Sequence, residues 1–288
     1  MEILTYSVVI GTAKCNVRCP FCVATMTPHY ENGADENASF NIENLIAGAD
    51  LAVRGGATTM LLTGKGEPTL YPDQITDALI HLKGKFPIVE LQTNGLALAN
   101  DSLDQYLIQW RSLGLKTIAI SVVSYDREKN KMMNPRHQPE MPDLGDLGEK
   151  LRKMRFTVRL SVVMVKGGID TIPELKTMIE WCRDKGVHQL TLRPVTRPED
   201  AEGKVSSWIS QNCVSENLVR EAIAFLGHHG ELLLQLPHGA LVYDVEGQNV
   251  CLTNCLTSDP SGRQIRQLIY CTDGHIRYDW RYEGAILF

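Results

Sequence analysis

Short runs of apolar residues alternate along the chain with longer segments in which apolar residues recur at helical spacing. Such runs are typical of strands buried on both faces, and such segments are typical of amphipathic helices. The predicted strands cover residues 7–12, 58–63, 88–92, 117–123, 158–165 and 189–192. The predicted helices cover residues 41–53, 73–82, 102–113, 144–154, 173–185 and 216–226. Regular alternation of this kind predicts a parallel sheet with the helices outside it.

The number of rounds and a change of pattern near the end predict the domain organisation. Six strand–helix rounds are too few for a closed eight-stranded barrel, so we predict an α/β fold, a partial (β/α)6 TIM-like barrel. After Gly230 the pattern changes to short β-rich pieces at residues 231–236, 265–270 and 275–280. We therefore predict a barrel over residues 1–198 and a β-rich C-terminal extension over residues 199–288, which covers the barrel or binds substrate.

Composition excludes several classes of protein. The 288 residues are 43% hydrophobic and 22% charged, which is too apolar for a disordered chain. No apolar run reaches the roughly 18 residues of a membrane span, and the first residues lack the basic and apolar regions of a signal peptide. The net charge of -5 argues against bulk binding of nucleic acid. We expect a cytoplasmic protein that acts on a small-molecule substrate and binds no membrane.

Three of the eight cysteines, Cys15, Cys19 and Cys22, lie in the loop after the first predicted strand. Loops at this end of barrel strands carry active sites, and closely spaced thiolates bind soft metal centres. A structural zinc site would need a fourth ligand, for which His29 is a candidate. An iron–sulfur cluster held by only three cysteines would leave one iron open to a small molecule. A loop of unrelated thiols is the third alternative.

The cysteine motif, with the aromatic Phe21 directly before its third cysteine, resembles that of the radical S-adenosylmethionine (SAM) superfamily. Two further segments match this family in the same order. Residues 65–67 (Lys-Gly-Glu) resemble its Gly-Gly-Glu motif, with a lysine in place of the first glycine, and residues 92–95 (Gln-Thr-Asn-Gly) end the third predicted strand. The resemblance extends from residue 7 to about residue 195.

The resemblance implies two cofactors, a [4Fe–4S] cluster on the three cysteines and SAM on the open iron. In this family one electron from the cluster cleaves SAM, and the resulting 5′-deoxyadenosyl radical abstracts a hydrogen atom from the substrate. An electron donor such as flavodoxin or ferredoxin is then an expected partner. By the same resemblance, the residues expected to contact the cofactors are Phe21, Gly66, Glu67, Asn94 and Ser121.

Several of these residues also have a simpler interpretation. Phe21 would otherwise be ordinary loop packing, Glu67 a charge favoured at a helix start, and Asn94 part of a common Asn-Gly turn. Arg159 lies inside a predicted strand, where a charge needs a partner. That partner is either the carboxylate or phosphate of a bound ligand, which adds Arg159 to the candidate cofactor contacts, or a buried glutamate. Arg193 poses the same choice, and both arginines favour a small polar or anionic, nucleotide-like substrate.

Two other features have more than one interpretation. Residues 125–143 form a long charged connection, which is typical of a lid or substrate loop but also of a solvated loop. A second trio, Cys251, Cys255 and Cys271, would suit a second iron–sulfur cluster. A buried cysteine in a strand is also simply a small hydrophobic residue.

We therefore predict a radical SAM enzyme that begins its reaction by abstracting a hydrogen atom. Two further enzyme hypotheses are an activase that installs a glycyl radical on a partner protein and an enzyme that modifies a peptide or RNA. A hypothesis of another class is a non-catalytic binding module stabilised by a metal. Iron content and SAM cleavage separate the enzyme from the module, which would be colourless and hold zinc.

Overall fold

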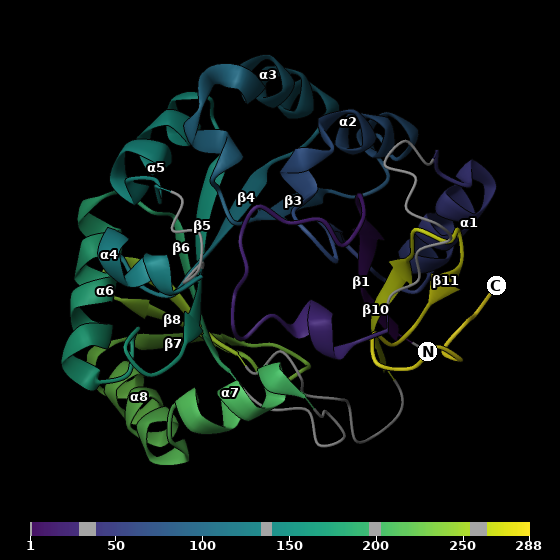
Figure 1. Cartoon of the computed structure of the whole chain (residues 1–288). Helices are drawn as coiled ribbons and strands as arrows, with labels where there is room; N and C mark the ends of the chain where they lie inside the picture. Colours follow the sequence, from purple (N-terminus) through teal and green to yellow (C-terminus); the bar gives the residue numbers. More distant parts are fainter. Residues whose placement is uncertain (1, 29–38, 134–139, 196–202, 254–263) are drawn as a thin grey trace.

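The structure is a computed structural model of the chain, and it describes residues 2–28, 39–133, 140–195, 203–253 and 264–288. Parallel strands β1 to β6 form the centre of its sheet (Figure 1). They are β1 (Glu2–Val9), β2 (Thr59–Thr63), β3 (Ile88–Thr93), β4 (Thr117–Val122), β5 (Thr157–Met164) and β6 (Gln189–Pro194). Each pairs with the next in chain order, which confirms the predicted parallel sheet.

Helices cover the outer face of this sheet (Figure 1). They are α1 (Ile42–Arg54), α2 (Pro72–His81), α3 (Asp104–Leu113), α5 (Leu144–Lys153) and α6 (Ile172–Asp184), while the short helix α4 (Arg127–Asn130) lies beyond the carboxyl end of β4. The predicted helix over residues 41–53 is confirmed within one residue. It begins where predicted because the side chain of Asn41 accepts a hydrogen bond from the Asn44 N–H at 3.1 Å.

The C-terminal part extends the same sheet instead of forming a separate one. Its elements are α7 (Lys204–Asn212), α8 (Glu216–His229), β7 (Glu231–Gln235), β8 (Leu241–Val245), β9 (Gln248–Leu252), β10 (Gln264–Tyr270) and β11 (Ile276–Arg277). Strand β9 pairs in parallel with β6, and β10 pairs in parallel with β1. The order β11-β10-β1-β2-β3-β4-β5-β6-β9-β8-β7 describes one open sheet of 11 strands. This confirms a partial barrel with a β-rich extension, while the predicted boundary at 198/199 lies outside the described residues.

Strand β1 begins earlier than the apolar pattern predicted. It covers Glu2–Val9, whereas the run of β-branched residues favoured 7–12. Its first residues mix the apolar Ile3 and Leu4 with polar residues and do not form a continuous apolar run, but they pair in register with β10. Because that partner comes from the other end of the chain, a local pattern could not reveal the pairing.

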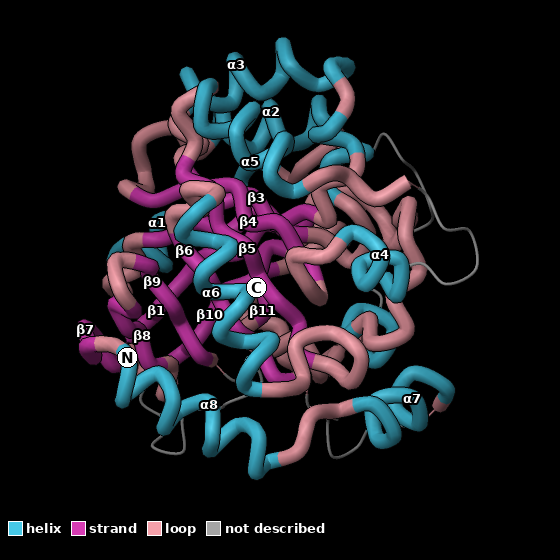
Figure 2. The backbone as a smooth tube through the Cα atoms, turned by 90° about the vertical axis from the view of Figure 1, so that its left-hand side faces the viewer, coloured by secondary structure: helices cyan, strands magenta, loops and turns pink. Residues whose placement is uncertain are grey.

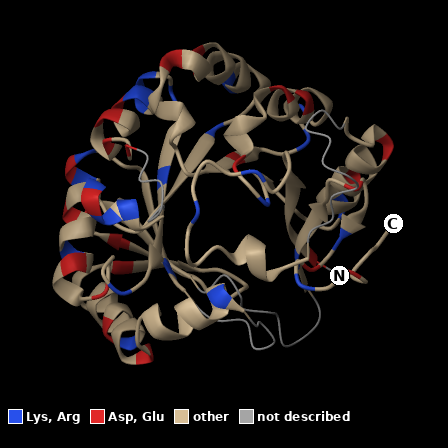
Figure 3. Cartoon of the chain, in the orientation of Figure 1, with Lys and Arg blue, Asp and Glu red and all other residues tan. Residues whose placement is uncertain are grey.

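The outer surface carries charges of both signs. Lysines and arginines are interspersed with aspartates and glutamates over the outer helices (Figure 3). Helices α7 and α8 lie at the end of the molecule opposite α2 and α3 (Figure 2). No helix in the described part of the chain is both long and apolar enough to cross a membrane.

The two faces of the sheet differ in chemistry. On β1, the Tyr6 hydroxyl donates a hydrogen bond to the Leu45 carbonyl of α1 at 2.8 Å, so Tyr6 faces the helices and Ser7 faces the inside. Alternation and register give the inner face a polar set: Ser7, Glu90, Gln92, Ser121, Arg159, Ser161, Gln189, Thr191 and Arg193. In closed barrels, branched apolar side chains fill the interior that the inner face of the sheet lines. A polar inner face instead suits a bound polar molecule.

Candidate active site

The loop that follows β1 carries the three clustered cysteines, and we call residues 10–22 the cluster loop. The Cys22 N–H donates a hydrogen bond to the Cys19 carbonyl at 3.2 Å. Burial raises the pKa of the Cys19 thiol, and the charges of Cys22 and Cys15 raise it further. Burial is also the main cause that raises the pKa of Cys15, with smaller contributions from Glu67 and Cys22. The structure thus places the three predicted cysteines in one loop after β1, and their role as ligands of a common cluster remains a prediction.

The chemistry of this donor set suits an iron–sulfur cluster. In the described part of the chain, no three Cys, His, Asp or Glu side chains are gathered as ligands of one metal ion. Zinc would require sulfur atoms about 2.3 Å from a single point, whereas each cysteine of a cluster binds a different iron. A cationic cluster core would also stabilise the thiolate forms of Cys15 and Cys19, which burial disfavours. The zinc alternative stays untested because His29 lies outside the described residues.

Gly66 allows the cluster loop to pass close to the end of β2. The N–H of Glu67 donates a hydrogen bond to the Lys14 carbonyl at 3.0 Å. A Cβ atom on Gly66 would lie 2.0 Å from the Lys14 carbonyl oxygen and 2.7 Å from that of Thr12. We expected this glycine to admit a ligand. In the structure it admits the backbone of the cluster loop itself, and a cofactor contact remains a prediction.

The buried carboxylate of Glu67 ties the ends of β2 and β3 together. Its Oε1 accepts hydrogen bonds from the Thr69 N–H at 3.0 Å and from the hydroxyls of Thr69 and Thr93, both at 2.6 Å. Its Oε2 accepts one from the Asn94 N–H at 2.9 Å. Burial raises the pKa of this carboxyl, against the effect of those donors. Glu67 also caps the short helix Pro68–Leu70, in agreement with the simpler alternative, while its contact with SAM remains a prediction.

Asn94 connects the end of β3 to the cluster loop. Its side-chain N–H group donates a hydrogen bond to the Asn16 side-chain oxygen at 2.6 Å and lies 3.9 Å from the Cys15 sulfur. Its side-chain oxygen accepts a hydrogen bond from the Leu96 N–H at 3.0 Å, which is the turn that Asn-Gly predicted. Asn94 is therefore both a turn residue and a neighbour of the first cysteine.

Phe21 packs against the C-terminal part of the chain. Its ring centroid lies 5.9 Å from that of Trp208 on α7. The same apolar cluster contains the buried side chains of Met133, Met141 and Ile209. Nothing in the sequence near residue 208 indicated this contact, because the two rings come from distant segments. Phe21 thus anchors the cluster loop, and its expected contact with the cofactors remains a prediction.

We expect Trp208→Ala to loosen the cluster loop. Loss of the half-buried ring should lower the free energy of unfolding by about 2 kcal/mol, measured by urea denaturation, and should speed iron loss from reconstituted protein. Trp181→Ala is the matched control, since Trp181 is also half-buried but stacks on Tyr125 at 6.1 Å. Equal rates of iron loss in the two variants would contradict this role of Trp208.

Lys65, the departure from the family motif, reaches toward the C-terminal part. Its Nζ donates a hydrogen bond to the Thr27 hydroxyl at 2.5 Å and lies 5.2 Å from the centroid of the Trp280 ring. Burial is the main cause that lowers the pKa of Lys65 to about 8. A glycine at this position would make neither contact. The lysine therefore joins the segment after the cluster loop to the segment after β11, a connection that the sequence did not indicate.

Arg159 and Ser121 lie on the inner face of the sheet. Ser121 pairs in register with Ser161 near the carboxyl ends of β4 and β5. Arg159 lies closer to the amino end of β5, where its Nη1 is 2.7 Å from Oε2 of the buried Glu90. Its Nε donates a hydrogen bond to the Gln189 side chain at 2.9 Å. Of the two partners considered for Arg159, the structure thus supplies the buried glutamate, and contacts of Ser121 and Arg159 with a cofactor remain predictions.

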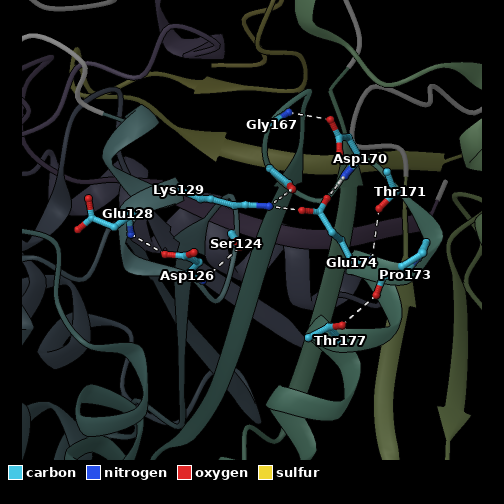
Figure 4. A network of polar contacts seen from close by, with 11 residues as sticks. Ser124, Asp126, Glu128, Lys129, Gly167, Asp170, Thr171, Pro173, Glu174 and Thr177 are labelled. Carbon is cyan, nitrogen blue, oxygen red and sulfur yellow. Dashed lines mark hydrogen bonds and ion pairs between the residues drawn. The ribbon is translucent and has the colours of Figure 1, made fainter.

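The connection over residues 125–143 is anchored to the barrel in its described part, which leaves out 134–139. Lys129 of α4 forms an ion pair with Glu174 of α6 (Figure 4). Asn130 is buried, and its side-chain oxygen accepts hydrogen bonds from two backbone N–H groups just after β4 at 2.9 and 3.2 Å. This part is therefore a wall beside the cluster loop and not a solvated loop, and its role as a lid remains a prediction.

The second cysteine trio stays a prediction because Cys255 lies outside the described residues. Cys251 lies on β9, where burial raises the pKa of its thiol against the charges of Arg159 and Arg193. Cys271 is buried at the other edge of the sheet, and burial is the main cause that raises the pKa of its thiol to about 11.

Comparison with known proteins assigns a family to this chain. The sequence model of the "Radical SAM superfamily" matches residues 9–200. GTP 3′,8-cyclase of Aquifex aeolicus is 28% identical over 224 residues, which cover 74% of this chain and 63% of that protein. GTP 3′,8-cyclase of Chlorobaculum tepidum is 28% identical over 186 residues, which cover 63% of this chain and 50% of that protein. The chain thus spans between half and two-thirds of the length of these relatives.

A solved structure supports the fold. SuiB of Streptococcus suis, bound to S-adenosylmethionine, superimposes with a TM-score of 0.63 at 15% sequence identity. The superposition covers 98% of this chain and 61% of SuiB. At this identity the likeness concerns the fold alone, and it extends beyond the barrel into the C-terminal strands.

Proposed function

The chain belongs to the radical SAM superfamily, and from that premise we propose that Cys15, Cys19 and Cys22 hold a [4Fe–4S] cluster that binds SAM. The chain is accordingly an enzyme and not a non-catalytic binding module. When bound, the cofactors supply one electron and a 5′-deoxyadenosyl radical that abstracts a hydrogen atom from the substrate. The observation that carries the proposal is the position of all three cysteines in the loop that follows the carboxyl end of β1 in a parallel sheet.

In this proposal the chain holds the cluster loop rigid on three sides. The hydrogen bond from Glu67 to Lys14 fixes its middle, and Asn94 holds the segment between Cys15 and Cys19 through Asn16. Trp208 covers Phe21 from the C-terminal part and excludes water from that side. The residues proposed to contact SAM or the cluster are Phe21, Gly66, Glu67, Asn94, Ser121 and Arg159.

We infer that the substrate is a small anionic, nucleotide-like molecule and that a flavodoxin or ferredoxin supplies the electron. The support for a nucleotide is the similarity to two GTP 3′,8-cyclases, although the chain covers only part of their length. The support for a small polar molecule is the polar inner face, where Gln92, Ser121, Arg159, Gln189 and Arg193 are only half-buried and so remain accessible to solvent. A glycyl-radical partner, a peptide or an RNA has no such support in the contacts described above.

The test is SAM cleavage by anaerobically reconstituted protein. After reduction with dithionite, the full chain should convert SAM to 5′-deoxyadenosine and methionine, and GTP should be consumed in the same reaction. Protein that holds zinc or makes no 5′-deoxyadenosine would contradict the proposed chemistry. Cleavage of SAM without consumption of GTP would contradict only the proposed substrate. An iron content of about eight per chain would support a second cluster at Cys251, Cys255 and Cys271. An iron content of about four per chain would contradict a second cluster.

A further inference from the structure

The two arginines on the inner face of the sheet have different surroundings. Arg159 has its charge balanced by Glu90 at 2.7 Å and donates a hydrogen bond to Gln189. Arg193, on the next strand, has no carboxylate partner in the described part of the chain, and its Nε is buried without a hydrogen-bond partner. Because a buried N–H group requires an acceptor, Arg193 is, of these two arginines, the one available for a ligand.

Arg193 lies at the end of the barrel that carries the cluster loop. It is the last residue but one of β6, so it faces the region beyond the carboxyl ends of the strands. Arg159 lies opposite Gln189, four residues deeper along the strand than Arg193. An anion bound at Arg193 would therefore lie between the Arg159–Glu90 ion pair and the cluster loop.

A second unpartnered polar group lies beside Arg193. The Thr253 N–H donates a hydrogen bond to the Leu192 carbonyl at 3.0 Å, which continues the pairing of β6 with β9 by one residue. Thr253 therefore lies opposite Arg193 in register and points to the same face. Its hydroxyl is buried and has no hydrogen-bond partner within the described ranges. Two neighbouring donors thus lack acceptors on the same patch of the inner face.

The charge around this patch is positive. Arg159 and Arg193 both act on the Cys251 thiol between them and lower its pKa against the larger effect of burial. The pKa of His238 is lowered chiefly by burial and then by the charges of Arg266 and Arg193. A guanidinium fork beside a hydroxyl matches the oxygens of a phosphate or a carboxylate.

We propose that Arg193 and Thr253 form a subsite that binds the anionic group, a phosphate or a carboxylate, of the substrate. The inference rests on the proposed function for the existence of that substrate. The inference specifies which group of the substrate the chain recognises and which residues recognise it. Arg159 lies outside this subsite, because Glu90 already balances its charge.

The test measures anion binding by the SAM-loaded holoenzyme under anaerobic conditions. Inorganic phosphate and malonate are titrated separately, and their dissociation constants are taken from the rise in melting temperature. We expect Arg193→Gln to weaken binding of the preferred anion at least about tenfold, because a charge-assisted bidentate contact is lost. Thr253→Val, which keeps the shape of the side chain, should weaken it about threefold. Arg220→Gln, at an exposed position on α8, is the control and should bind as the wild type does.

The preferred anion identifies the chemistry of the substrate group. Tighter binding of phosphate supports a nucleotide-like substrate, and tighter binding of malonate supports a carboxylate. Equal binding by wild type and Arg193→Gln, or no binding of either anion by the wild type, would overturn the subsite. Loss of SAM binding in Arg193→Gln would also overturn it, since the anion would then belong to SAM. The titration needs no turnover, so a holoenzyme that binds SAM without cleaving it still tests the subsite separately from the proposed reaction.

Discussion

Cys19→Ala is expected to abolish formation of 5′-deoxyadenosine, to the limit of detection, and to remove the iron held by the cluster loop, about four per chain. Cys19 is the middle ligand of the cluster loop, and its thiol interacts with those of Cys15 and Cys22. With only two cysteines left, two of the four irons would have no protein ligand. Two protein ligands are too few to hold a cluster in a site that also binds a small molecule. Iron per chain, visible absorption and 5′-deoxyadenosine are measured in the same anaerobic preparation.

The matched control for Cys19→Ala is Cys182→Ala, which removes a thiol buried in α6. That variant should be less stable because it leaves a small cavity, yet it should keep its iron and its SAM cleavage. A Cys19→Ala protein with a full iron content would show that the cluster loop is not the site of the cofactor.

Gly66→Ala is expected to lower the rate of SAM cleavage about a hundredfold, since a displacement of about 1 Å at a reacting centre is enough for such a loss. The new Cβ would lie 2.0 Å from the Lys14 carbonyl oxygen and 2.7 Å from that of Thr12. Both are backbone atoms, so the cluster loop has to move as a whole. The measurement is the rate of 5′-deoxyadenosine formation per bound cluster, with iron content measured in parallel.

Gly148→Ala is the control for this substitution. Gly148 lies within α5, and a Cβ there would meet no atom within 4 Å outside its own helix and its chain neighbours. Alanine at that position should raise the free energy of unfolding by roughly 0.5–1 kcal/mol and leave SAM cleavage unchanged. If Gly66→Ala cleaved SAM as fast as Gly148→Ala, the close passage of the cluster loop would have no functional importance.

The central barrel could be predicted from the sequence because its signals are local. Each of the strands β1 to β6 is an apolar run, and turn residues such as Gly114 separate the helices from the strands that follow. The hairpin of β8 and β9 was not predicted, although its two-residue turn contains a glycine, Gly247, which is typical of such turns. Glu246 and Gly247 both have positive φ, 51° and 88°, as a two-residue hairpin turn requires. A glutamate in that conformation is uncommon, so the pair did not stand out.

The candidate site was predictable only as far as its motifs are local. The spacing of the cysteines identified the cluster loop, and the Asn-Gly pair identified the turn after β3. The reason for Gly66 was not visible, because it depends on the path of the chain near Lys14. The packing of Trp208 on Phe21 depends in the same way on contacts between distant segments.

The two arginines show the same limit most clearly. Strand periodicity assigned Arg159 and Arg193 the same status, as charges that need partners. The structure separates them because Glu90 extends from β3 past Ala119 of β4 to reach Arg159 on β5. A pairing across an intervening strand depends on register and on the small size of the residue between, which no local pattern encodes.

The most direct test of the cluster loop as a cofactor site is electron paramagnetic resonance of the dithionite-reduced, reconstituted protein during titration with SAM. A cluster held by Cys15, Cys19 and Cys22 has an open iron, so its signal should change in g values as SAM binds and should be absent from Cys19→Ala. A cluster signal that SAM leaves unchanged, or a reduced protein with no cluster signal, would contradict the account.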